Sequence, residues 1–181
     1  QVSGYLSTVH GDLHLGNILV GPTGNAWLID FAWTREGHTL FDWALLELSW
    51  LVEVVGRCAA PGWAGAWEIL ALLDQINHGA DGEDLRRHPA GPALRVLKTI
   101  RAIAAECLGT PDRWSEYYVA LALLGLRLMD WQSEPVDARR LAFLASALAA
   151  AAVHVAGDSH TTSPSQWVDT TDIDLTEFRS E

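Results

Sequence analysis

His10-Gly11-Asp12-Leu13-His14-Leu15-Gly16-Asn17-Ile18-Leu19-Val20 is the stretch that decides the fold of this chain, together with Trp27-Leu28-Ile29-Asp30-Phe31 a few residues later. Each stretch contains a short apolar run, and Gly21-Pro22-Thr23-Gly24-Asn25 lies between the two runs. Proline presets one turn dihedral, and glycine tolerates positive φ. The sequence therefore predicts a β-hairpin at this point.

Polar side chains flank the predicted hairpin. Asn17 comes just before its first strand and Asp30 just after its second. Because a hairpin brings its outer ends together, we expect these side chains to face each other, with Asp12 on the loop leading in. Oxygen ligands of this kind suit magnesium, which keeps several waters and shares its other ligands with phosphate. The pattern favours phosphoryl transfer, with Asn17 and Asp30 on the metal and Asp12 accepting the proton of the attacking hydroxyl.

His10-Gly11-Asp12 with Asn17, followed by Ile29-Asp30-Phe31, resembles the catalytic-loop and metal-binding motifs of the protein-kinase-like superfamily, in the form used by aminoglycoside phosphotransferases. The combination carries the likeness, since a lone His-x-Asp would mean little. The wording of residues 27–47 is also similar to the phosphotransferase-like ternary complex associated domains of bacterial conflict systems. The motifs cover roughly residues 9–47, and the helical remainder is compatible with them.

The resemblance implies roles for three further residues. Asp42, at the start of the next predicted helix, matches an Asp that braces the catalytic loop, and His10 matches a structural histidine that hydrogen-bonds nearby backbone. His14 stands where protein kinases carry Lys and small-molecule kinases carry His, which favours the small-molecule branch. His14 either joins Asp12 in the catalytic set, contacting the transferring phosphate when protonated, or only fills space.

Two positions depart from the family pattern. Leu15 replaces the Pro that is common in these loops, and Ala32 stands where protein kinases have Gly. A switch of the protein-kinase type at Ala32 is therefore not expected. Residues 32–39 are too few for a long regulated activation loop.

Each candidate residue also has a purely structural interpretation. Asp12 is then a loop residue that caps the hairpin through backbone N–H groups, Asn17 stabilises a tight turn, and Asp30 accepts backbone bonds at a strand end. Glu47 and Glu53 are nominal ligands for a cationic substrate, and a solvated helix face explains them at least as well.

Two other metal chemistries fit less well. Gly11 to Asn17 contains the beginning of a metallophosphoesterase signature, but the second Gly-Asp motif and the later Gly-Asn-His of that family are missing. His10, Asp12 and His14 alternate like ligands on one strand face, but Gly11 and the lack of a further ligand cluster argue against a zinc site.

Composition limits the partners of the chain. A net charge of -11 over 181 residues argues against nucleic acid or an anionic membrane as a main partner. It leaves a cationic substrate open. Two distant cysteines without metal-like spacing indicate a reducing, cytoplasmic location. Arg95, Lys98 and Arg101 form a basic stripe that is expected to be a solvated helix face, and the nine Trp residues are expected in the core.

The remainder of the chain predicts helices. Nearly half of all residues are apolar, so one full core is expected. The predicted fold is α+β and mainly α: a protein-kinase-like C-terminal lobe with a small catalytic hairpin, about five helices and no N-terminal lobe. The expected helices are Leu40 to Val55, Trp63 to Ile76, Ala93 to Cys107, Pro111-Asp112 to about Trp131, and a last one from Pro135.

The predicted organisation is one kinase-like lobe, residues 1–156, followed by a flexible acidic Ser/Thr-rich tail or linker, residues 157–181. Because the catalytic loop comes within a dozen residues of the start, we expect the nucleotide-binding lobe to precede this segment in a longer protein. The expected ligands are magnesium, ATP or GTP, and a small-molecule substrate. The alternative is a non-catalytic adaptor or nucleotide-binding switch in a bacterial conflict or signalling protein.

Overall fold

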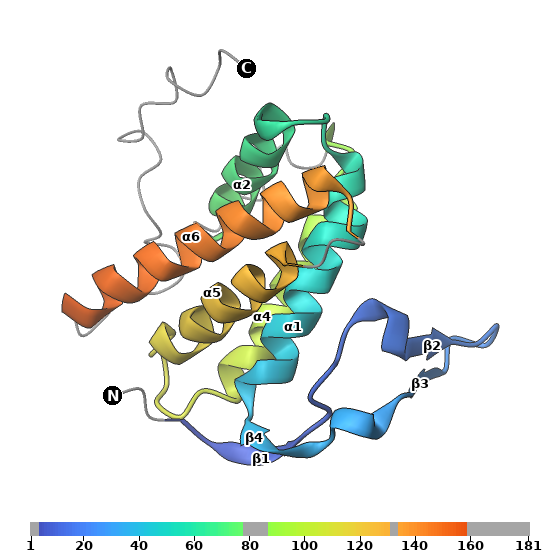
Figure 1. The fold of residues 1–181 in the computed structure, drawn as a ribbon, viewed down its shortest axis with the longest axis vertical. Coiled ribbons are helices and arrows are strands. Elements are labelled where there is room, and N and C mark those ends of the chain that lie inside the picture. The colour runs from blue at the N-terminus through green and yellow to red at the C-terminus, as the bar shows by residue number, and fades with distance from the viewer. Residues whose placement is uncertain (1–3, 78–86, 131–133, 159–181) are drawn as a thin grey trace.

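The computed structural model describes residues 4–77, 87–130 and 134–158. Figure 1 shows a bundle of helices with a small arm of strands at one end. The predicted class, α+β and mainly α, is confirmed. The elements are β1 (Leu6–Val9), β2 (Ile18–Val20), β3 (Ala26–Leu28), β4 (Arg35–His38), α1 (Leu40–Trp50), α2 (Trp63–Asn77), α4 (Gly91–Glu106), α5 (Ser115–Met129) and α6 (Val136–Asp158).

The strands form two separate antiparallel pairs. β2 pairs with β3, with Leu19 opposite Trp27, so the predicted hairpin is present. Its turn is closed by the Gly21 amide, which donates to the Asn25 carbonyl at 2.8 Å, and Gly24 supplies the positive φ of 81°. β1 pairs with β4, which brings the start of the chain beside the segment that enters α1. Together the two pairs form the arm at the lower right of Figure 1.

α1 follows the arm and packs against α4 and α5 in the bundle. Its helical path runs on through a π-helical turn, Leu51–Val55, and a 3-10 turn, Gly56–Cys58, so the predicted helix of residues 40–55 is confirmed. Apolar side chains that face the bundle from this path are fully buried, among them Leu40, Leu48 and Val55. This continuous spine is the element against which both the helical core and the arm are fixed.

The closest helix packing joins α5 to α6. Gly125 permits it, because a Cβ atom at this position would lie 2.8 Å from the Cβ of Ser146 and 3.0 Å from the carbonyl oxygen of Ala142. The Ser146 hydroxyl donates a 2.6 Å hydrogen bond to the Ala122 carbonyl across the same seam. The alanine-rich last helix is thus a close-packing element.

A buried ion pair links α1, α4 and α5. Arg101 Nη2 and Nε donate to the Glu47 carboxylate at 2.6 to 3.0 Å, and the Tyr117 hydroxyl donates to it at 2.6 Å. Burial is the largest single influence on the pKa of the Arg101 guanidinium and lowers it, but the charge and hydrogen bonds of Glu47, together with Tyr117 and Tyr118, raise this pKa above its usual value. Burial and Glu47 both raise the pKa of Tyr117. The solvated-face interpretations of Glu47 and Arg101 are therefore wrong, and so is Glu47 as a ligand for a substrate.

Several helix ends differ from the prediction. α5 begins at Ser115 and not at Pro111, because Asp112 has a positive φ of 62° and lies in a turn that the Arg113 amide closes onto Thr110. Pro92 sits in the first turn of α4, where its missing N–H costs nothing, so that helix starts at Gly91.

The predicted boundary between the lobe and the C-terminal tail can be compared with the end of the last helix. The last helix reaches Asp158, two residues beyond the predicted boundary at 156, and the rest of the predicted tail, residues 159–181, lies outside the described residues. Within the described part of the chain, none of the helices has the length and apolar character needed to cross a membrane.

Candidate functional site

The loop of residues 10–17 is tied to the first turn of α1 by Asp42. The two carboxylate oxygens of Asp42 accept the backbone amides of His10 at 2.6 Å and Gly11 at 3.0 Å. Gly11 adopts a φ of 81°, and a Cβ atom there would meet the Trp33 carbonyl. Only glycine therefore fits between this carboxylate and the segment that follows the hairpin.

His10 joins the same loop to the hairpin. Its ring is buried, and Nε2 lies 2.8 Å from the Ile29 carbonyl oxygen. Because a carbonyl only accepts, Nε2 carries the proton and donates it. The ring also packs against Phe31 with 4.9 Å between centroids. His10 thus fixes the backbone immediately before Asp30, while its other ring nitrogen, Nδ1, is buried without a hydrogen-bond partner in the described structure.

Asn17 is buried at the mouth of the hairpin, and its orientation is set by hydrogen bonding. Nδ2 donates to the Asp12 carbonyl at 2.9 Å, while the Asn17 carbonyl accepts the Ile29 amide at 3.0 Å. The amide nitrogen must face the Asp12 carbonyl, so Oδ1 points the other way. The backbone of Asn17 thus lies beside that of Ile29, the neighbour of Asp30, as the hairpin prediction requires.

Asp30 is held in an unusual backbone conformation. Its φ and ψ are 62° and 63°, in the left-handed region, and its exposed side chain makes no capping hydrogen bond to the turn that follows. A non-glycine residue in this region costs of order 1–2 kcal/mol. The backbone of Asp30 is therefore strained at the end of the hairpin, and no capping hydrogen bond from its own side chain accounts for this conformation.

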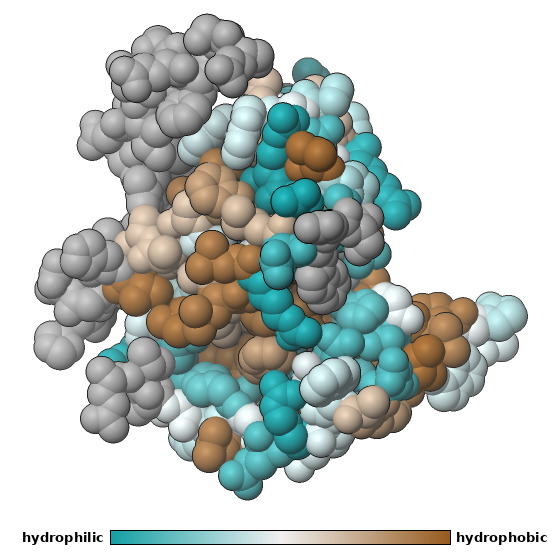
Figure 2. Space-filling model, viewed as in Figure 1, coloured by the Kyte–Doolittle hydropathy of each residue, from teal (hydrophilic) through white to brown (hydrophobic). Residues whose placement is uncertain are grey.

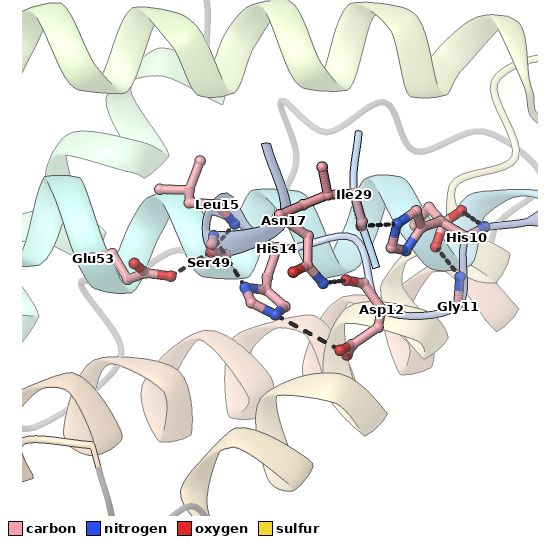
Figure 3. A network of polar contacts seen from close by, with 11 residues as sticks. His10, Gly11, Asp12, His14, Leu15, Asn17, Ile29, Ser49 and Glu53 are labelled. Carbon is pink, nitrogen blue, oxygen red and sulfur yellow. Dashed lines mark hydrogen bonds and ion pairs between the residues drawn. The ribbon is translucent and has the colours of Figure 1, made fainter. Parts of the chain in front are cut away.

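Asp12 and His14 point toward one another below the hairpin (Figure 3). His14 Nε2 lies 3.7 Å from Asp12 Oδ2, and both side chains are partly exposed. The Gly16 amide donates to His14 Nδ1 at 3.1 Å, so the neutral ring carries its proton on Nε2, on the side of Asp12. The Nε2–H of His14 is therefore available as a donor on the side of Asp12.

A second anchor joins the loop to α1, and sequence reasoning missed it. The Leu15 amide donates to Ser49 Oγ at 2.9 Å, and Ser49 Oγ donates to Glu53 Oε1 at 2.6 Å (Figure 3). Ser49 gives little signal in an apolar helix. The usable signal is Leu15 itself, because the Pro common at this position has no N–H to donate.

Comparison with known protein families gives one match for this chain. A family model described as ternary complex associated domain 9 matches residues 1–130, which is most of the chain. The chain belongs to this family. No curated protein and no solved structure matches it. The predicted likeness to ternary complex associated domains is therefore confirmed, and the kinase-like relationship stays a prediction.

Two adjoining cavities open beside the loop of this ternary complex associated domain. The smaller, about 200 Å³, is lined by His14, Gly16 and Ser49 among others, and the larger, about 350 Å³, continues toward the start of α6. Both share Val52, Glu53 and Glu134 as walls, so we name the pair the α1 groove. Glu53 remains a candidate ligand, in contrast to buried Glu47.

Metal binding would depend on few protein ligands. Among the described residues, no group of three or more His, Cys, Asp or Glu side chains is arranged to hold a metal ion. Oδ1 of Asn17 and the carboxylate of Asp30 are hard oxygen donors at adjoining backbone positions, and magnesium accepts one or two such ligands when phosphate and water supply the others. This donor pair fits magnesium and does not fit a closed zinc site.

Several tryptophans depart from the prediction of a core role. Trp27 and Trp33 are more than half exposed on the arm, while Trp114 is buried. Of these two exposed tryptophans, Trp27 belongs to the hairpin and Trp33 to the turn after Asp30. Figure 2 shows the hairpin's brown apolar surface at the right of the view, away from the bundle.

Proposed function

We propose that this domain catalyses magnesium-dependent phosphoryl transfer from ATP or GTP to a hydroxyl group of a small molecule, as the C-terminal lobe of a longer kinase-like protein. The observation that carries the proposal is that Asp12, Asn17 and Asp30 lie on one loop-and-hairpin unit, in which Asn17 is bonded both to the Asp12 carbonyl and to the Ile29 amide beside Asp30. Asp42 and Ser49 fix this unit to α1. The family match shows which family the chain belongs to and states no activity.

The proposed reaction is a direct in-line displacement. The acceptor hydroxyl oxygen forms a bond to the γ-phosphorus as the bond to the β,γ-bridging oxygen breaks, and the nucleoside diphosphate leaves with that electron pair. Asp12 accepts the hydroxyl proton, which its partly exposed carboxylate can reach. His14, with its proton on Nε2, donates to a phosphate oxygen.

Asn17 and Asp30 would hold the metal. A magnesium ion bound there would neutralise negative charge on the β- and γ-phosphates. The strained conformation of Asp30 supports this role, because strain retained at an exposed polar residue is common at functional sites.

The α1 groove is the proposed binding place of the acceptor. It begins at His14, beside the proposed base, and its shared walls carry the carboxylates of Glu53 and Glu134. A hydroxylated molecule with amino groups suits this lining, because carboxylates pair with ammonium groups.

The experiment is magnesium-dependent nucleotide binding and hydrolysis by the full-length protein, compared with Asp30→Ala. The matched control is Glu36→Ala, which removes the same charge from an exposed position on the same arm. We expect Asp30→Ala to abolish magnesium-dependent binding and Glu36→Ala to leave it intact. Absence of nucleotide binding in the unmodified protein would refute the proposal.

A second candidate function is a nucleotide-binding switch or adaptor. The exposed apolar side chains of the hairpin favour it, because exposed apolar surface of this kind is typical of interaction sites. Nucleotide binding without turnover in the same experiment would select this alternative.

A further inference from the structure

We propose that Ser49 and Glu53 are positioning residues, which hold the loop carrying Asp12 and His14 against the wall of the α1 groove. The inference rests on the proposed function and assigns to it two residues that carry no recognisable sequence motif. Ser49 is buried, and its hydroxyl is the only link in the described structure between the Leu15 amide and the second half of the α1 path.

The direction of the two hydrogen bonds at Ser49 Oγ explains why Glu53 is needed. A serine hydroxyl has one hydrogen, and Ser49 donates it in a hydrogen bond to the Glu53 carboxylate, with 2.6 Å between Oγ and Oε1. The lone pairs of Ser49 Oγ are then turned toward the loop, where the Leu15 N–H donates at 2.9 Å. Without Glu53, the hydroxyl hydrogen is free to bond the carbonyl one turn earlier in the helix, as buried helical serines often do. Glu53 therefore orients Ser49, and Ser49 orients the loop.

The helix geometry places Glu53 in two roles at once. Glu53 lies in the π-helical turn Leu51–Val55, and such turns are often found at functional sites. Its carboxylate holds Ser49, and Glu53 is also one of the residues that line both cavities of the α1 groove. A molecule in the groove thus lies against the residue that fixes the loop, which couples acceptor binding to the placement of Asp12 and His14.

Leu15 permits a test with little disturbance of the backbone. It opens the 3-10 turn Leu15–Asn17, and His14 before it is extended, with ψ of 170°. Proline fits the first position of such a turn and prefers an extended residue before it. Leu15→Pro therefore removes the N–H donor while keeping the conformation.

The first measurement is hydrogen exchange of the Gly16 and Asn17 amides in the full chain. Loss of one hydrogen bond predicts about tenfold faster exchange in Ser49→Ala, Glu53→Ala and Leu15→Pro. Ser49→Thr, which keeps the hydroxyl, should restore slow exchange, and Glu106→Ala, an exposed carboxylate on another helix, should have no effect. In the Leu15→Pro background, Ser49→Ala should add nothing.

The second measurement is nucleotide hydrolysis by the full-length protein. A positioning role predicts a kcat several-fold lower in Ser49→Ala and Glu53→Ala, with the KM for nucleotide within about twofold of the original. Unchanged loop exchange in these two variants would overturn the inference. If the unmodified protein hydrolyses no nucleotide, the proposed function fails, and the exchange data still decide whether Ser49 and Glu53 hold the loop.

Discussion

The helical bundle and the strand arm are stabilised by different physics. In the bundle even a charge is buried: Glu47 is 2% exposed, and Arg101 and Tyr117 both donate hydrogen bonds to its carboxylate. In the arm, large apolar side chains stay in water, and Trp33 is 64% exposed. The arm is instead held by strand pairing and by hydrogen bonds to α1. The bundle thus supplies stability, and the arm keeps Asp30 exposed to solvent.

The largest expected effect lies in the bundle. Arg101→Met removes the partner of a buried carboxylate, which typically costs about 3–5 kcal/mol because the remaining charge is uncompensated. We expect the free energy of unfolding, measured by urea titration, to fall by this amount. Arg95→Met on the exposed face of the same helix is the control and should change it by less than about 0.5 kcal/mol. A small loss for Arg101→Met would mean that Glu47 is solvated after all.

Two glycine substitutions, one in the bundle and one in the arm, test the same comparison and should have intermediate effects on stability. Gly125→Ala forces a Cβ against Ser146 at the α5–α6 seam and should cost about 1–3 kcal/mol by overpacking. Gly24→Ala, at the hairpin turn, meets no atom within 4 Å, so its cost of about 1 kcal/mol comes from the positive φ alone. Thermal unfolding of both variants tests this order, and a reversed order would place the tighter packing in the arm.

The features that could be predicted from the sequence are those that depend on residues close together in the chain. The turn residues between the two apolar runs predicted the hairpin, and the long apolar run predicted the path of α1 through Val55. The sequence did not predict the environment of Glu47, because the deciding partner, Arg101, is 54 residues away. A glutamate on a helix is usually solvated, and only the fold brings the two charges together.

The candidate site was predicted unevenly for similar reasons. Hairpin geometry brings Asn17 and Asp30 to adjoining positions, and spacing along the loop places Asp12 near them. Ser49 escaped prediction because a serine in an apolar helix looks like an ordinary small core residue. The positive φ values of Asp30 and Asp112 were also missed, since aspartate occupies many other conformations and no single residue pattern marks this one.

The smallest expected change in stability comes from Asp30→Gly, which should affect stability and nucleotide binding in opposite directions. Asp30→Gly removes an exposed carboxylate from a left-handed conformation that glycine adopts without strain, so we expect unfolding free energy to rise by about 0.5–1 kcal/mol. Asp130→Gly, at a φ of -78°, is the matched control and should lose stability, because glycine only adds freedom to the unfolded chain there. The same Asp30→Gly variant should lose magnesium-dependent nucleotide binding in the full-length protein. A variant that becomes more stable as it loses binding would identify Asp30 as a residue kept for its chemistry, whereas a loss of stability would make it an ordinary structural turn residue.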